Sequence, residues 1–236
     1  MGLDDIANEI LANKSIHALL AKAIDGKQSL CEHPFKKLVE YQRDAYAKEG
    51  LSIDKEGFQV GEPWNGDIKN ACVAFISSNP AFNPHEYFPR YHAGTKTISM
   101  PNGRQLSFDK AREFFERRFK DAHITDSGVL QVKCLDRHNG ACHYQTVPYW
   151  GCVRNSMETL WPNARKPGDT KETYVRRLMR KAVSMELVPF KSSGEKGVPE
   201  ALPTCLRNFA RHILPHVAAP IIVLVGKKVR RAFMDF

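Results

Sequence analysis

The sequence lacks any apolar stretch long enough to cross a bilayer. Its longest apolar run covers residues 217–225 and is interrupted by Pro220, whereas a membrane-spanning helix needs about 20 residues. The first 25 residues carry acidic side chains and no apolar core before a small-residue cleavage site, so they do not resemble a secretory signal. We therefore expect no membrane partner and a cytoplasmic, or at least intracellular, protein.

Closely spaced cysteine pairs are missing as well. The six cysteines are scattered at positions 31, 72, 134, 142, 152 and 205, which excludes a small secreted disulfide scaffold. Cys134, His138, Cys142 and His143 form a loose cluster, but no cysteine pair has the spacing of a zinc knuckle. We expect buried free thiols and polar loop histidines here and no metal, with a structural zinc as the alternative.

The chain also contains no glycine-rich phosphate loop of the Walker or Rossmann type, which disfavours an NTPase or a dehydrogenase. A compact pair of carboxylates is absent too, which disfavours a metal-dependent nuclease, although Glu86, Asp136 and the cysteine–histidine cluster keep that alternative open. A small-molecule enzyme acting on nucleotides or nucleosides is a further alternative. We expect no cofactor.

What the sequence does contain is an uneven positive charge. The formal net charge is +9, but residues 1–70 hold 9 basic and 12 acidic side chains, whereas residues 71–236 hold 26 basic and 14 acidic ones. A basic body behind a mildly acidic N-terminal segment favours a polyanionic partner, with nucleic acid first. Charge that serves only solubility is the alternative.

The length of 236 residues suits one sizeable domain with an N-terminal extension. Apolar residues at three- and four-residue steps predict helices over 3–24 and about 35–49, with Gly26 and Gly50 as stops. We expect residues 1–60 to form a helical segment packed on a main domain of residues 61–236. We also expect a monomer.

The main domain alternates strand and helix patterns. Residues 71–77 form a nearly continuous apolar run, which is typical of a strand covered on both faces. Residues 221–225 are the most strand-like, and 95–108 predict a hairpin around Pro101-Asn102-Gly103. A strand is expected over 129–134 and a short apolar strand at 185–188, with helices over 109–120, 151–160, 170–183 and 199–214. This order predicts an α/β fold with a mainly parallel central sheet.

Three segments leave the carboxyl ends of the predicted parallel strands, where open α/β sheets bind ligands. They cover residues 77–84, 189–193 and 226–228. Asn79 precedes Pro80, so its backbone is restricted and its carboxamide can be aimed at a substrate, and Phe82 can stack on that substrate. The alternative is an ordinary Asn-Pro turn that ends a strand.

The same three segments carry a family resemblance. "VAFISSNPAFNP" resembles motif 1 of the uracil-DNA glycosylase superfamily, "MELVPFKSS" is similar to its second core strand, and "IIVLVGKKVRRAF" resembles its third. The order and rough spacing of the three agree over residues 70–236. The resemblance implies a three-layer α/β/α domain that flips a damaged base, such as uracil or a related deaminated base, out of DNA and hydrolyses its N-glycosidic bond.

The resemblance also implies roles for single residues. Asn79 would position or activate the attacking water, and its neighbours Ser78 and Pro80 would help to bind the substrate. Phe82 would stack on the base. Glu186 and Ser192 or Ser193 would lie near the base-recognition end of the second strand. Gly226 would let the backbone approach DNA, with Lys227 and Lys228 near phosphates.

Glycosidic cleavage passes through an oxocarbenium-like state that a nearby negative charge or a positioned water stabilises. Asn79 cannot ionise and would be a poor general base. Glu86 is the nearest acid along the chain and is therefore our candidate base. Its alternative is a surface carboxylate on a loop.

The chain departs from the superfamily pattern after the Gly-Lys segment. The superfamily has a fourth core strand with a His- or Ser-containing loop that stabilises the leaving base, and this chain reaches Phe236 before such a motif. We expect that the motif is absent, that the chain is shortened, or that the role lies elsewhere. His85 and His92 are then possible substitutes.

Two basic segments support a nucleic-acid partner, here DNA. Residues 109–120 hold five cations, including Arg118, and residues 165–181 hold seven against two acids. In the second segment Arg176 and Arg180 recur on one helical face and predict phosphate contacts. A solvated helix face is the alternative. A protein that binds nucleic acid on the same fold without catalysis is the alternative to a glycosylase.

Overall fold

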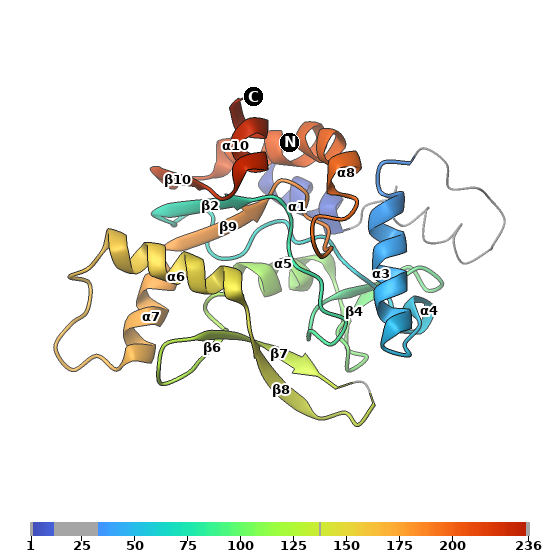
Figure 1. Cartoon of the computed structure of the whole chain (residues 1–236), viewed down its shortest axis with the longest axis horizontal. Coiled ribbons are helices and arrows are strands. Elements are labelled where there is room, and N and C mark those ends of the chain that lie inside the picture. The colour runs from blue at the N-terminus through green and yellow to red at the C-terminus, as the bar shows by residue number, and fades with distance from the viewer. Residues whose placement is uncertain (1, 12–32, 137, 235–236) are drawn as a thin grey trace.

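The computed structural model describes residues 2–11, 33–136 and 138–234. Helices surround one parallel and two antiparallel sheets in a mixed α/β fold (Figure 1). The parallel sheet contains β2 (Val73–Ser77), β9 (Ala182–Glu186) and β10 (Ile221–Leu224). One antiparallel sheet contains β1 (Phe58–Gln59), β3 (Arg90–His92), β4 (Thr97–Ser99) and β5 (Gln105–Leu106). The other contains β6 (His123–Ile124), β7 (Leu130–Leu135) and β8 (Cys142–Thr146).

The parallel sheet is the frame of the molecule. Its strand order is β10–β2–β9, so the strand predicted from residues 71–77 lies in the middle. Val73 pairs with both Ile221 and Ala182, and every residue of β2 is buried. This confirms the prediction of a strand covered on both faces. The parallel sheet has three strands among the described residues, and the remaining strands pair antiparallel. Of these antiparallel pairings, the sequence patterns predict only the β4–β5 hairpin.

Alternate residues of β2 pack into two separate hydrophobic clusters. Ala74 and Ile76 join the larger cluster, together with apolar side chains of the N-terminal and C-terminal helices. Val73 and Phe75 join the second cluster with the helices that follow β8. The first group of helices is α1 (Leu3–Leu11), α3 (Lys36–Lys48), α5 (Phe108–Glu116), α8 (Val198–Cys205), α9 (Arg211–Ile213) and α10 (Lys227–Met234). The second group is α6 (Pro148–Leu160) and α7 (Lys171–Met179).

The short elements complete the chain order. One helical turn, α4 (Ile53–Glu56), precedes β1, and a π-helical turn over Leu206–Ala210 connects α8 to α9. Pro203 lies inside α8 and cannot donate a backbone hydrogen bond, which accounts for an irregular continuation of the helix predicted over 199–214. A 3-10 turn, Leu214–His216, then leads towards β10.

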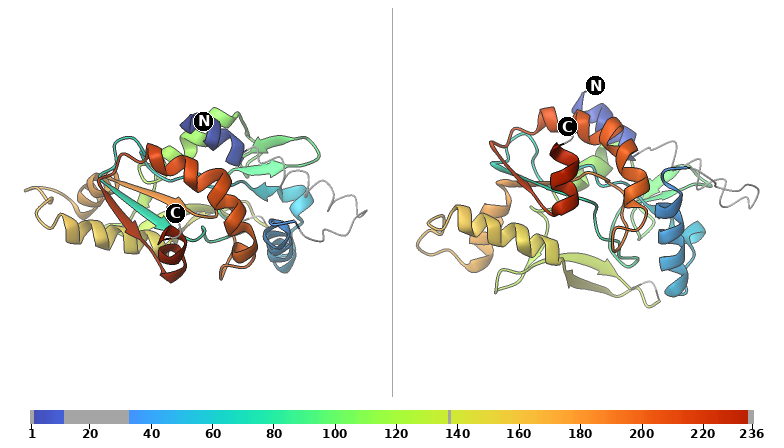
Figure 2. Two further views of the ribbon diagram at one scale, coloured as in Figure 1. Left: turned by 90° about the horizontal axis from the view of Figure 1, so that it is seen from above. Right: turned by 45° about the horizontal axis from the view of Figure 1, so that its top comes forward.

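The N-terminal helix is part of the same packing. α1 lies against α5 and α9 (Figure 2), and Ile6 and Ile10 are buried in the larger cluster. Asp4 of α1 also lies 3.3 Å from a guanidinium nitrogen of Arg112 on α5. The predicted helix over 3–24 is confirmed for its first part, and residues 12–24 of that prediction lie outside the described residues. No described helix has the length and apolar character required to span a membrane.

Two local predictions were wrong for identifiable reasons. The helix predicted to run through 183 ends at Met179, because Ala182 and Val183 pair with β2 and are fully buried in the sheet. β8 was not predicted at all, since its five residues are exposed and show no apolar alternation. The hairpin around Pro101-Asn102-Gly103 and the strand near 129–134 are confirmed by the β4–β5 pairing and by β7.

Candidate functional site

A cavity of about 440 Å³ lies at the carboxyl ends of the three parallel strands. The segment from Ser77 to Asn83 lines it after β2, Glu186 and Lys191 line it at the end of β9, and Val225 and Gly226 line it after β10. The structure therefore brings the three strand-end segments together in one place. Further walls come from Glu62, Asn65, Arg118 and the β8–α6 connection from Gln145 to Trp150.

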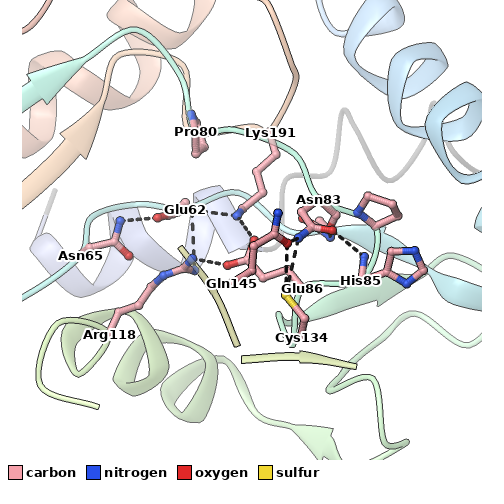
Figure 3. A network of polar contacts seen from close by, with 12 residues as sticks. Glu62, Asn65, Pro80, Asn83, His85, Glu86, Arg118, Cys134, Gln145 and Lys191 are labelled. Carbon is pink, nitrogen blue, oxygen red and sulfur yellow. Dashed lines mark hydrogen bonds and ion pairs between the residues drawn. The ribbon is translucent and has the colours of Figure 1, made fainter. Parts of the chain in front are cut away.

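Four ionisable side chains on the cavity wall form a buried ion cluster, defined as Glu62, Glu86, Arg118 and Lys191 (Figure 3). Arg118 donates to Oε1 of Glu86, and Lys191 Nζ donates to Oε2 of Glu86 at 2.7 Å. Oε2 of Glu62 lies 3.4 Å from Lys191 Nζ and 3.8 Å from Arg118 Nη1. Two carboxylates and two cations thus compensate each other away from water.

Backbone pairing holds each carboxylate of the cluster in position. Glu86 bridges to Cys134 of β7, and the neighbouring Tyr87 N–H donates to the Lys133 carbonyl at 2.8 Å. Glu62 N–H donates to the Pro189 carbonyl at 2.8 Å. Asn65 exchanges backbone hydrogen bonds with Ser184 of β9 at 2.7 and 2.9 Å and donates its side-chain amide to Glu62.

Gly66 permits this close approach of the loop to β9. Its φ is +95°, and a Cβ at this position would lie 2.6 Å from the Ala182 carbonyl oxygen. A larger residue would therefore push the loop away from the strand and shift Glu62 and Asn65 with it.

Burial and charge act in opposite directions on Glu86. Burial alone would raise the pKa of its carboxyl, but the charges of Arg118 and Lys191 and their hydrogen bonds lower that pKa overall. For Arg118, burial would lower the pKa, and the charges of Glu62 and Glu86 raise it. Both groups stay ionised at neutral pH. A carboxylate with a low pKa is a weak base, so Glu86 is better suited to fixing charge than to accepting a proton.

Aromatic rings surround the two cations. Lys191 Nζ lies 3.9 Å from the ring centre of Phe88, and the Arg118 guanidinium lies 4.8 Å from Phe88 and 5.2 Å from Trp150. These contacts stabilise the buried positive charges through the ring quadrupoles. They also exclude water from the rear of the cluster.

Glu186 behaves differently from Glu86, although both are buried carboxyls. Burial raises the pKa of Glu186 to about 8, an effect that the nearby Glu62 charge increases and the hydrogen bond from the Ser77 hydroxyl reduces. Burial likewise raises the pKa of Tyr149 on the adjoining wall. Glu186 is therefore mainly protonated at neutral pH and presents a neutral group that can both donate and accept hydrogen bonds.

Hydrogen bonds donated by its nitrogen fix the orientation of the Asn79 carboxamide. Nδ2 donates to the Ser192 hydroxyl at 3.0 Å, to the Ser192 carbonyl at 3.2 Å and to the Pro80 carbonyl at 3.1 Å. Ser192 N–H in turn donates to the Pro80 carbonyl at 3.1 Å. Ser192 thus orients Asn79 rather than lining the cavity, and Ser193 is exposed outside it. The carboxamide oxygen of Asn79 remains as an acceptor.

Phe82 lies on the cavity wall with its ring fixed by α3. Its ring centre is 5.9 Å from that of Tyr41 and 5.4 Å from that of Tyr46, and both contacts are nearly perpendicular. Ser78 and Pro80 line the same wall. Edge-to-face contacts of this kind restrain a ring without covering all of it.

The cavity wall also contains unsatisfied polar atoms. Within the part of the chain that the structure describes, Asn65 Oδ1 and Arg118 Nε are buried and have no hydrogen-bond partner. Such atoms are rare in folded proteins and need solvent or a ligand to satisfy them. The cavity therefore offers both a donor and an acceptor to a bound polar molecule.

The predicted DNA-binding residues fall at two different places. Gly226 lines the cavity, and Lys227 and Lys228 begin α10 beside it, with Lys228 paired to Glu195. Arg176 donates to the Lys120 carbonyl at 2.5 Å, and Arg180 lies just before the start of β9. The two arginines are therefore at the opposite end of the parallel sheet from the cavity.

The remaining candidates do not reach the cavity. His85 lies 3.5 Å from Glu49, and His92 lies 2.9 Å from the Ser99 hydroxyl, and neither lines the cavity. Cys134 is buried, whereas Cys142 and His143 are exposed on the β7–β8 hairpin. Over residues 2–11, 33–136 and 138–234, no group of three or more His, Cys, Asp or Glu side chains is placed to hold a metal ion.

The sequence indicated Glu86 as a site residue, but it did not indicate Glu62 or Lys191 as members of the ion cluster. Arg118 was assigned to a basic nucleic-acid face, yet Phe114 and Phe115 precede it at helical spacing, which indicates an apolar face. Lys191 directly follows the apolar residues Val188-Pro189-Phe190, a signal for a buried cation at a strand end. Glu62 carries no comparable local signal. The surface alternative for Glu86 is wrong, because Arg118 and Lys191 compensate its burial.

No protein-family model matches this chain, and neither a curated protein nor a solved structure matches it. Function must therefore be inferred from the cavity itself. Its position at the strand ends, its buried ion cluster, its neutral carboxyl and its fixed carboxamide are the features that any function has to use.

The ion cluster predicts a large stability cost for Glu86→Gln. The substitution leaves Arg118 and Lys191 buried with one carboxylate between them, and we expect a loss of about 3–5 kcal/mol in the free energy of unfolding at pH 7. Urea denaturation measures this loss.

Glu113→Gln is the matched control. The Glu113 side chain is 42% exposed beside Lys110, so this substitution should lower the free energy of unfolding by about 1 kcal/mol or less. Because the pKa of Glu86 is lowered in the folded chain, the stability that it contributes is lost as the pH falls below the ordinary carboxyl value of 4.5, and the difference from the Glu86→Gln variant should shrink there. Equal costs for the two variants would contradict the cluster.

Glu186→Gln tests the raised pKa. Below the ordinary carboxyl pKa of 4.5, Glu186 is protonated in both the folded and the unfolded chain. Its raised pKa therefore does not lower the free energy of unfolding in this pH range. Between that value and about 8, only the unfolded chain releases the proton, so wild-type stability should fall as the pH rises, by up to about 1.4 kcal/mol per pH unit. The variant should lack this slope and exceed the wild type in stability at pH 8. Parallel profiles from urea denaturation at pH 5 to 8 would show that Glu186 ionises normally.

Proposed function

We propose that this protein is a DNA glycosylase, which extrudes a damaged base from DNA and hydrolyses its N-glycosidic bond. The observation that carries the proposal is the cavity, since its walls are the ends of the three strands whose sequences resemble the uracil-DNA glycosylase superfamily. Uracil or a related deaminated base is the proposed substrate class. A base inside a duplex is inaccessible at its reacting carbon, so the enzyme needs a separate pocket of this kind.

The proposed architecture is a three-layer α/β/α domain of the superfamily type. The parallel order β10–β2–β9 and the two hydrophobic clusters on alternate residues of β2 support it. α6 and α7 cover one face of this sheet, and helices that include α8 and α10 cover the other (Figure 1). The two antiparallel sheets are then additions to that frame.

Phe82 and Glu186 are the proposed base-recognition groups. Phe82 offers a restrained aromatic ring for stacking, and Glu186 offers a neutral carboxyl for a base carbonyl or imino group. Ser77 occupies Oε2 of Glu186, which leaves Oε1 for the base. A protonated carboxyl avoids the repulsion that an ionised one would exert on the acceptor oxygens of a deaminated base.

Asn79 is the proposed water-positioning residue. Its nitrogen is engaged by Ser192 and Pro80, so its oxygen can accept a hydrogen bond from a water aimed at the sugar. Glu86 contributes through the ion cluster and not as a free base. Glu86 holds Arg118 and Lys191 on the cavity wall, and Arg118 Nε, which has no hydrogen-bond partner among the described residues, is a donor for the negative charge that the departing base develops.

The start of α10 is the proposed phosphate contact. Gly226 is exposed at the cavity mouth and has φ of +97°, and Lys227 follows it with its side chain exposed. Lys228 is partly neutralised by Glu195. Arg176 and Arg180 lie at the far end of the sheet and take no part in this proposal.

The direct test is release of a base from duplex and single-stranded oligonucleotides that contain uracil, hypoxanthine or a mismatch, scored as alkali-labile abasic sites. We expect cleavage of at least one deaminated substrate. Asn79→Ala should lower the single-turnover rate by about 10²–10³-fold, because it removes the group that orients water. Asn102→Ala, in the exposed β4–β5 turn, should keep the wild-type rate.

Two outcomes would contradict parts of this proposal. Undiminished activity of Asn79→Ala would reject the catalytic role of that residue. Absence of base release from every substrate, together with DNA binding that weakens steeply with salt, would reject the enzyme. It would favour a protein that binds nucleic acid on the same fold without catalysis.

A further inference from the structure

A second concave surface lies between α8 and α10, away from the strand-end cavity. It forms a groove of about 870 Å³ and shares no lining residue with that cavity. Figure 2 shows α8 and α10 side by side in both views. The groove has an apolar floor made by Val198, Pro199, Leu202, Pro203, Leu206 and Ala232. Below, "the groove" denotes this surface and its rim.

The floor follows helical spacing. Val198, Leu202 and Leu206 are four residues apart, so they form one row along α8 and the turn after it. Val198 is buried at one end of the row, whereas Leu202 and Leu206, with Ala232 of α10 opposite them, are half-buried and leave apolar surface open to solvent. From Val198 to Arg211 the wall is about 20 Å long at ~1.5 Å per residue, which matches three to four turns of another helix.

Cationic side chains flank this apolar floor on both sides. Arg207 and Arg211 lie one helical turn apart on the first wall, and Lys228 and Arg231 lie on the α10 wall. Among the residues that the structure describes, no acidic side chain lines the groove. Lys228 pairs with Glu195, but Arg207, Arg211 and Arg231 have no ion pair with any residue that the structure describes. Three exposed and uncompensated guanidinium groups thus flank an apolar row.

We propose that the groove binds an amphipathic helix of a partner protein that carries acidic residues on both sides of its apolar face. The apolar row would pack against the partner's leucine-type side chains, and the two rows of cations would meet its carboxylates. A nucleic acid would satisfy the cations but would leave the apolar floor uncovered. The proposal does not require the glycosylase reaction, since the groove and the strand-end cavity have no lining residue in common. The two surfaces adjoin at the start of α10, where Lys227 is the proposed phosphate contact and Lys228 lines the groove.

The test uses the full chain and a fluorescein-labelled synthetic helix of about 14 residues, with leucines at three- and four-residue steps and glutamates on both flanks. Fluorescence anisotropy should detect saturable binding. We expect Arg207→Glu combined with Arg211→Glu to weaken binding about tenfold or more, because it reverses one wall of the rim. Leu202→Gln should weaken it by a similar factor without changing the charge.

Two matched controls separate the groove from general charge. The hairpin control combines Lys96→Glu, in the exposed turn before β4, with Arg104→Glu, in the exposed turn before β5. It changes the net charge equally and should leave binding within about twofold. A second peptide, with serine in place of every leucine, should bind at least about tenfold more weakly. Circular dichroism and urea denaturation should show that each variant is folded.

Three results would overturn the proposal. The first is equal binding of the leucine and serine peptides, which would reduce the effect to charge. The second is loss of binding in the hairpin control as large as that in the rim variant. The third is full displacement of the peptide by duplex DNA from the wild-type protein, together with weaker direct binding of that duplex to the rim variant, which would assign the groove to nucleic acid.

Discussion

The carboxylate of Glu86, held between Arg118 and Lys191, is the interaction on which the candidate site depends. It joins segments that are far apart in the chain: the loop after β2, the end of α5 and the segment after β9. Glu62 lies in the loop before β2 and contacts the same two cations, so this loop is joined to the other three segments. Because each charge is buried, removing one leaves its partner uncompensated, so the four segments hold one another in place.

This constraint explains why the neighbouring polar groups have such different properties. Glu86 has two cationic partners and a lowered pKa, whereas Glu186 lies nearby without a directly bonded cation and has a raised one. The two carboxyls therefore present an ionised and a neutral group in one cavity at the same pH. Replacing buried ion pairs by apolar residues of similar volume is often neutral or stabilising in proteins. The presence of these charges at a cavity wall is thus better explained by interaction with a polar ligand than by stability.

Much of the frame follows from local patterns, and the site does not. The uninterrupted apolar run at 71–77 predicts the central strand, and the position of Asn79 after that strand places it at the cavity. By contrast, the contact of Glu86 with Lys191 joins residues 105 positions apart, and no spacing rule connects them. β8 was missed because its residues are exposed, and the α7–β9 boundary because pairing with β2 outweighs helical preference. Burial of a charge depends on a distant partner, which one sequence does not reveal.

The central claim is that a flipped base occupies the cavity at the ends of β2, β9 and β10. A crystal structure of the protein with a duplex oligonucleotide that contains 2′-fluoro-deoxyuridine tests this most directly, because the fluorine slows cleavage by destabilising the oxocarbenium-like state. We expect the uracil ring outside the helical stack, in contact with Phe82 and Glu186, with a phosphate near Lys227. A uracil that stays stacked in the duplex, or a duplex bound along Arg176 and Arg180, would contradict it.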